Sequence, residues 1–183
     1  MRRWLVMGIG VVMAGAGAGV WAALHGQGIW SVPGHPWLRP GPAGGWLEEV
    51  ALQLLWGPGP AWGMGLAGAA APLAWAAVWL RGYLGGLAVA AAFLSGQPSP
   101  VRLVAGSLVP HALGCLAALV AAVGSFQLGA ATMRATVGIR PYELPHAFGR
   151  FLAAGAIGLG LAAVAGLLRA AVLAGSMAGP GAA

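Results

Sequence analysis

Residues 5–24 read LVMGIGVVMAGAGAGVWAAL, an unbroken apolar run that follows Arg2-Arg3-Trp4. A helix rises about 1.5 Å per residue, so this run is long enough to cross the ~30 Å hydrocarbon core of a bilayer. It therefore predicts a membrane-spanning helix over 4–24. A basic start followed by an apolar run also occurs in signal peptides, and cleavage would then fall near Ala22-Ala23. The run is long for a signal peptide, and we favour a retained anchor.

The composition of the whole chain also indicates a membrane protein. Of its 183 residues, 60% are hydrophobic and 7% are charged, and Lys, Asn and Asp do not occur. A soluble domain usually carries about 25% charged residues, which solvate its surface. The net charge of +6 comes from arginines scattered between apolar runs, whereas nucleic-acid-binding proteins cluster basic residues on one face. We expect the chain to contact the lipid bilayer and not nucleic acid.

Four further apolar segments complete an all-α fold, a polytopic membrane helix bundle that forms a single transmembrane domain over 1–183. We expect its five spans at about 4–24, 61–80, 82–96, 103–131 and 151–173. Pro72 is expected to kink the second span and Pro110 to bend the fourth, because proline removes a helical hydrogen bond. Glycines four residues apart predict faces on which another helix can approach closely. These pairs are Gly15 with Gly19, and Gly82 with Gly86.

The segment 25–60 is predicted to form an outer loop followed by a short interfacial or re-entrant helix. Residues 46–56 read WLEEVALQLLW, which is amphipathic but too short to span a bilayer. Its carboxylates, Glu48 and Glu49, suit the N-terminal end of a helix, where the macrodipole is positive. Gly57-Pro58-Gly59-Pro60 is expected to end this helix.

The arginines distinguish five spans from four. With a cytoplasmic N-terminus and five spans, most arginines fall on the cytoplasmic side, where the positive-inside rule favours them. These are Arg2, Arg3, Arg81, Arg134, Arg140 and Arg150. If 61–96 were one kinked span instead, the Arg-rich link 134–150 would lie outside. We therefore predict a multi-pass protein with its N-terminus in the cytoplasm and its C-terminus outside.

Ionisable residues inside apolar segments are the candidates for chemistry, since they are costly at membrane depth and often functional. His111 follows Pro110 in such a segment. One interpretation is a proton or ion role; we favour a neutral imidazole bonded to a backbone carbonyl that Pro110 leaves free. Arg169 either snorkels to the outer interface or pairs within the bundle. Cys115 is alone, which excludes an internal disulfide and a Cys-based zinc site, and we expect it to pack as a small apolar residue.

Outside the spans, we expect His146 and its neighbours Glu143 and Arg150 to form a surface ion pair at the cytoplasmic interface. The sequence PHALG at 110–114 recurs as PHAFG at 145–149. We interpret this as coincidence in a low-complexity chain rather than as a transporter repeat. Positioned acids, bases and nucleophiles do not converge in any recognisable spacing. We therefore expect no catalytic residue, no metal and no cofactor in a protein that is not an enzyme.

Residues 80–129 resemble the membrane family of stage II sporulation protein M. That family shows an Asn-Gly step followed by Leu-Gly, then a polar link, a Pro-His-Gly-x-x-Glu motif and a glycine-rich span. The matching stretches here are Leu80-Arg81-Gly82-Tyr83-Leu84-Gly85, 97–102, Leu108-Val109-Pro110-His111-Ala112-Leu113-Gly114-Cys115 and Gln127-Leu128-Gly129. Three motif positions depart from the family: Arg81 replaces Asn, Ala112 replaces Gly, and Cys115 replaces Glu.

The resemblance implies a non-catalytic membrane scaffold in the cell membrane of spore-forming bacteria. Such a scaffold recruits or anchors the wall hydrolases D and P, which act on peptidoglycan, at the septal membrane during engulfment. The resemblance implies partner-binding or functional roles for Arg81, Gly82, Pro110, His111, Gly114, Cys115 and Gly129. The alternative is a small permease or transporter subunit with a polar site near Pro110-His111, since discontinuous helices build binding sites at the middle of a membrane.

Overall fold

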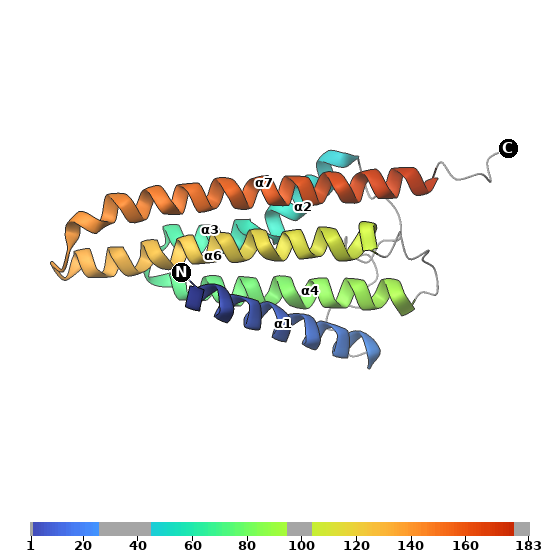
Figure 1. Cartoon of the computed structure of the whole chain (residues 1–183), viewed down its shortest axis with the longest axis horizontal. Coiled ribbons are helices and arrows are strands. Elements are labelled where there is room, and N and C mark those ends of the chain that lie inside the picture. The colour runs from blue at the N-terminus through green and yellow to red at the C-terminus, as the bar shows by residue number, and fades with distance from the viewer. Residues whose placement is uncertain (1, 26–44, 95–103, 178–183) are drawn as a thin grey trace.

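The computed structural model describes residues 2–25, 45–94 and 104–177, and this part of the chain is helical without strands. Its α-helices are α1 (Arg2–Leu24), α2 (Trp46–Trp56), α3 (Pro58–Leu66), α4 (Ala74–Leu94), α6 (Val109–Thr136) and α7 (Leu144–Met177). Two 3-10 segments, η2 (Gly68–Leu73) and η4 (Pro141–Glu143), and a π-helical turn, η3 (Val104–Leu108), lie between them. The long helices lie alongside one another and form an elongated bundle (Figure 1).

Four helical segments of the described residues are long and apolar enough to cross a membrane. They are Val6–Leu24, Ala71–Ala91, Val104–Thr136 and Pro141–Val172. Large apolar side chains cover the outside of these segments, and Ile9, Leu73 and Ile157 are each more than half exposed. Lipid solvates such a surface, whereas water would not. The described residues therefore form a helical bundle with the helix lengths and the apolar surface of a membrane protein.

The predicted boundary between spans 61–80 and 82–96 is wrong. Helix α4 runs from Ala74 to Leu94 without interruption at Arg81-Gly82. The helix breaks earlier, in η2, where Gly68 has a φ of 58° and Pro72 lies inside the 3-10 segment. A positive φ is costly for residues other than glycine, and proline cannot donate the helical hydrogen bond, so both residues favour a break here. Arg81 was interpreted as the end of a span, but its side chain is fully buried in the bundle.

Two other prolines lie in the first turns of α-helices. Pro110 was expected to bend a span; it lies in the first turn of α6, directly after the π-helical turn η3, within the helical segment Val104–Thr136. Pro145 similarly lies in the first turn of α7, so the predicted link 134–150 is shorter than expected. The first N–H groups of a helix have no intrahelical partner, so proline costs no hydrogen bond at that position.

The two glycine pairs are confirmed as points of close helix approach between α1 and α4. Gly15 and Gly19 of α1 lie against the backbone of Tyr83, where a Cβ atom would overlap main-chain atoms. Gly82 and Gly86 of α4 lie in the same way against the backbone of α1. The contacts advance in the same direction along both helices, so α1 and α4 are parallel (Figure 1). Close backbone approach of this kind drives helix association in lipid, where hydrophobic burial contributes little.

The short helix predicted over 46–56 is confirmed as α2, and it ends at Gly57 as expected. A second short helix, α3, begins at once at Pro58. Together α2 and α3 run antiparallel to α7: Val50 contacts Gly166, and Gly65 lies close to Phe151. The buried hydroxyl of Ser125 in α6 also donates a 2.7 Å hydrogen bond to the carbonyl of Ala61 in α3. The interrupted helix is therefore packed along the bundle rather than on its end.

The glycine contacts between α1 and α4 predict a specific pattern of stability changes. Gly19→Val should lower the free energy of unfolding by about 1–3 kcal/mol, because the new side chain overpacks a helix interface. Gly17→Val is the matched control, since a Cβ at Gly17 meets no neighbouring atom within 4 Å. Unfolding of the full-length chain in mixed detergent micelles measures both effects. Equal destabilisation by the two variants would contradict the observed α1–α4 interface.

Candidate functional site

Five polar side chains from four helices meet inside the bundle, and we call them the buried polar cluster. They are Glu49 and Gln53 of α2, Arg81 of α4, His111 of α6 and Arg169 of α7. Each of these residues is 5% exposed or less. Three of them lie within candidate membrane spans, where uncompensated polar groups are costly. The cluster is therefore the place where this chain departs furthest from a plain apolar bundle.

Arg81 is the centre of the cluster. Its Nη2 donates a 2.7 Å hydrogen bond to Oε1 of Gln53, and its Nη1 lies 3.1 Å from Nδ1 of His111. A guanidinium has donors and no acceptor, so Nδ1 of His111 must be the acceptor in this contact. The imidazole is then neutral, with its proton on Nε2. The favoured interpretation of a neutral imidazole agrees with this contact, in which the guanidinium of Arg81 is the partner of Nδ1.

Gly114 gives the Arg81 side chain its space. A Cβ atom at this position of α6 would overlap the Arg81 guanidinium. Glycine at residue 114 thus leaves room for the guanidinium in its observed position, and the backbone carbonyl of Gly114 also faces Gly57 at the end of α2. Pro110, one turn earlier, is buried at the start of α6. The Pro110–Gly114 segment and Arg81 thus form one packed unit.

Glu49 and Arg169 form an ion pair that ties α2 to α7. The carboxylate Oε2 of Glu49 lies 3.4 Å from Nη1 of Arg169. Of the two alternatives for Arg169, pairing within the bundle is therefore the correct one. Glu49 and Gln53 lie one helical turn apart on the same face of α2. That face carries a contact to α7 through Glu49 and a contact to α4 through Gln53.

The structure brings together some of the predicted functional residues and separates others. Arg81, His111 and Gly114 meet. Cys115 follows Gly114 directly in α6, and its side chain is partly exposed. Gly82 faces α1 instead, and Gly129 packs against η2. Glu49 and Gln53 were missed as functional candidates. A usable signal was present, since a buried arginine requires a partner and the sequence offers three glutamates.

An apolar groove of about 430 Å³ borders the buried polar cluster between α1, α4 and α6. His111 and Cys115 contribute to its wall, and its other lining residues are apolar or glycine. His111 thus separates the groove from Arg81. Within the described ranges, no three His, Cys, Asp or Glu side chains gather as a metal site would require.

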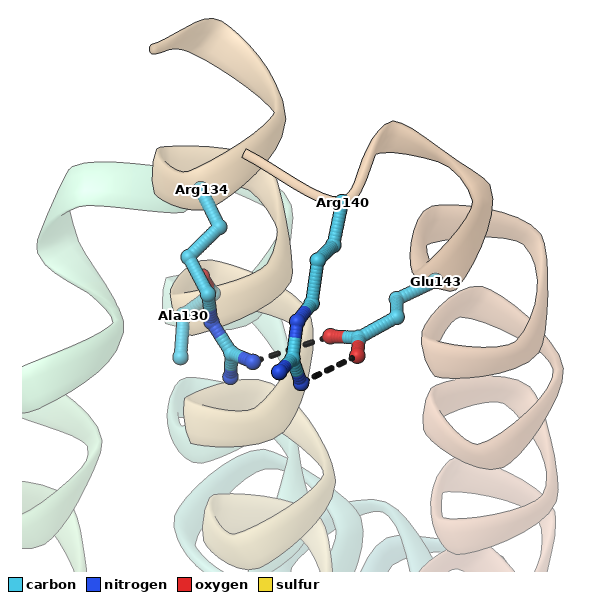
Figure 2. Close-up of polar contacts among 4 residues, drawn as sticks. All are labelled: Ala130, Arg134, Arg140 and Glu143. Atoms are coloured by element: carbon cyan, nitrogen blue, oxygen red, sulfur yellow. Dashed lines mark hydrogen bonds and ion pairs between the residues drawn. The ribbon is translucent and has the colours of Figure 1, made fainter. Parts of the chain in front are cut away.

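A second group of charges lies at the opposite end of α6, in the connection to α7 (Figure 2). Arg134 Nη1 is 2.9 Å from one carboxylate oxygen of Glu143, and Arg140 Nη1 is 3.2 Å from the other. The side chains of Arg134 and Arg140 are 46% and 61% exposed, and the side chain of Glu143 is 32% exposed. The surface ion pair expected at this end exists, but the partners of Glu143 are these arginines rather than His146 or Arg150.

Comparison of the chain with protein-family models, curated proteins and solved structures gave no match.

The two repeated Pro-His sequences lie in different surroundings: His111 is buried in the cluster, and His146 is exposed near the start of α7. The antiparallel packing of α6 on α7 puts these two helix starts at opposite ends of the bundle (Figure 1).

The Glu49–Arg169 pair predicts a large difference between two neighbouring carboxylates. Glu49→Gln should lower the free energy of unfolding by about 3 kcal/mol, because it leaves the buried Arg169 charge without its carboxylate. Glu48→Gln is the matched control, since Glu48 is exposed on the same helix turn, and it should change stability by less than about 0.5 kcal/mol.

The double variant Glu49→Leu with Arg169→Met provides a second test of the pair. It should recover most of the loss, because apolar side chains of similar volume can replace a buried pair. Detergent unfolding of the full-length chain measures all three variants. Equal losses for Glu48→Gln and Glu49→Gln would contradict the assigned ion pair.

Proposed function

We propose that this chain is a non-catalytic multi-pass membrane scaffold, similar to stage II sporulation protein M, that holds wall-hydrolysing partner proteins at the septal membrane. The observation that carries the proposal is the contact between the two sequence motifs of the resemblance. Arg81, in the first motif, contacts His111, in the second, although thirty residues separate them. Gly114 of the second motif packs on the same guanidinium.

The chemistry of this contact favours a structural role for the two motifs. The described polar groups of the cluster are directed at one another across α2, α4, α6 and α7. Arrangements of this kind fix which helices are neighbours and in which register they pack. A scaffold needs such a fixed shape, because its partners recognise a surface that must not change. The cluster is also almost completely shielded from the outside of the bundle.

The packing further supports five crossings of the membrane, with the α2–α3 pair as an interrupted second crossing. Because α1 and α4 are parallel, the chain between them must return across the bilayer. The described residues that run in that direction are α2 and α3, which lie antiparallel to α7. Interrupted helices are tolerated at membrane depth where protein surrounds them. Five crossings put the two termini on opposite sides.

Orientation follows from the arginines at one end of the bundle. Trp4 near the N-terminus lines the same pocket as Arg134 and Arg150, so the N-terminus and the α6–α7 connection share an end. By the positive-inside rule, that end faces the cytoplasm of a bacterial cell. The end of α1 at Leu24 and the start of α2 at Trp46 then face the outer side, where the hydrolysing partners work.

The five-crossing topology is testable with single cysteines in a Cys115→Ala background. On intact cells, a cysteine at Gly138, in the α6–α7 connection, should react with a membrane-permeant thiol reagent and not with an impermeant one. A cysteine at exposed His25 should react with an impermeant maleimide from outside. A C-terminal epitope tag should also be accessible from outside. A tag accessible only from the cytoplasm would contradict the fifth crossing.

The scaffold role is testable in the spore-forming host. Full-length tagged chain, extracted in mild detergent after cross-linking, should retain the host's wall hydrolases D and P. Deletion of its gene should arrest engulfment, because the hydrolases lose their membrane anchor. The Glu48→Gln variant should restore engulfment and Glu49→Gln should restore it poorly, since the second disturbs the buried polar cluster. Normal engulfment in the deletion strain, with no hydrolase retained, would rule out this role.

A transporter subunit is the second candidate, and one observation favours it. The break between α2 and α3 lies against the backbone of Gly114, next to Arg81. Interrupted helices of transporters similarly end beside a charged site within the membrane. Purified chain in proteoliposomes should then carry chloride or phosphate at a rate well above empty vesicles. Background rates for both anions would exclude an anion site at Arg81.

A further inference from the structure

A pocket of about 540 Å³ lies at the Arg-rich end of the bundle, away from the buried polar cluster. It is formed by one face of α6, the 3-10 segment η4, the first turns of α7 and the start of α1. The residues that matter for its chemistry are Trp4, Phe126, Arg134, Tyr142, His146 and Arg150. The candidate span that contains α6 ends at Thr136, and the candidate span that contains most of α7 begins at Pro141. The pocket is therefore at the level where lipid headgroups meet the protein.

The upper part of this pocket is basic. Arg134 and Arg150 both line it, and Glu143 is the one acidic residue of its wall. The carboxylate of Glu143 is already paired with Arg134 and with Arg140, which adds a further positive charge beside the pocket (Figure 2). Arg150 is exposed, and no carboxylate pairs with it in the described part of the chain. The pocket thus has guanidinium donors to offer an anion.

The lower part of the pocket is aromatic and apolar. The rings of Trp4 and Phe126 are 4.6 Å apart between centroids, and Trp4 also stacks on Trp75 at 6.4 Å. Ala130 and Ala131 complete this floor on α6. Trp and Tyr are the side chains that favour the membrane interface, because one part of each is apolar and another is polar. A ligand that fits this pocket has an anionic head and an apolar body.

We propose that this pocket binds an anionic phospholipid. The phosphate accepts hydrogen bonds from the guanidinium groups of Arg134 and Arg150, and an acyl chain lies over Trp4 and Phe126. Basic pockets between membrane helices bind anionic headgroups in this way, and planar guanidinium groups suit phosphate oxygens. A free phosphate ion would leave the aromatic floor uncovered. The site is independent of the proposed scaffold role, since the residues assigned to the phosphate and the acyl chain lie outside the quoted motifs, and Gln127 is the one motif residue on the pocket wall.

Native mass spectrometry of the delipidated, full-length protein tests the proposal. Phosphatidylglycerol should bind more tightly than phosphatidylcholine with the same acyl chains. Arg150→Gln should weaken phosphatidylglycerol binding about fivefold, as expected for one arginine near an anionic lipid surface. Arg150→Lys should keep most of the binding.

Three results would overturn the proposal. The first is equal binding of phosphatidylglycerol by the wild type and Arg150→Gln, provided that both unfold at the same detergent concentration. The second is equal affinity for phosphatidylglycerol and phosphatidylcholine, which would indicate an apolar groove without headgroup recognition. The third is displacement of the lipid by millimolar inorganic phosphate, because that outcome assigns the arginines to a free anion. Each result is independent of whether wall hydrolases bind elsewhere on the chain.

Discussion

Arg81 and Arg169 carry two guanidinium groups into a bundle whose other core residues are mostly small and apolar. Moving a charge from water into such surroundings costs several kcal/mol, and only a well-placed partner offsets the cost. Each of the two arginines has a partner on α2, where Glu49 and Gln53 lie one turn apart. This short helix is therefore held beside α4 and α7 by polar contacts. Removing α2 from its place would leave two buried cations without those groups, so its position is tightly constrained.

Alanine and glycine surfaces provide the rest of the packing, and they specify neighbours in a different way. The core around Ala61, Val78 and Ala118 consists of small side chains that many helix faces could match. Glycines make some of these faces selective, because the backbone of α1 can approach α4 only where no Cβ intervenes. In lipid, dispersion contacts at such close distances are a main attraction between helices. The glycine contacts thus determine the α1–α4 pair, while the buried polar cluster determines where α2 lies.

Local patterns predicted much of this fold and little of its site. The apolar runs predicted a helical membrane bundle, and Gly57-Pro58-Gly59-Pro60 predicted the end of α2, because both signals act over a few residues. The continuity of α4 was not predicted, since Arg81 was interpreted as a marker of the membrane surface. Its interior position depends on Gln53 and His111, which are 28 and 30 residues away. His111 was singled out by its apolar surroundings and Arg81 by the resemblance, but the contact between them was not predicted. A pairing of this kind becomes visible only when separate helices are placed side by side.

The position of Arg81 also changes how the arginines bear on topology. A residue inside the bundle is not held on either side of the membrane, so it contributes nothing to a comparison between the two sides. With Arg81 left out, the proposed five crossings are supported by the directions of the helices. The parallel direction of α1 and α4 requires a return of the chain between them. The interrupted α2–α3 pair is the described segment that runs the required way, and its break lies beside Gly114 and the Arg81 guanidinium. The same residue that misled the boundary prediction is thus part of the environment that lets a broken helix lie inside the bundle.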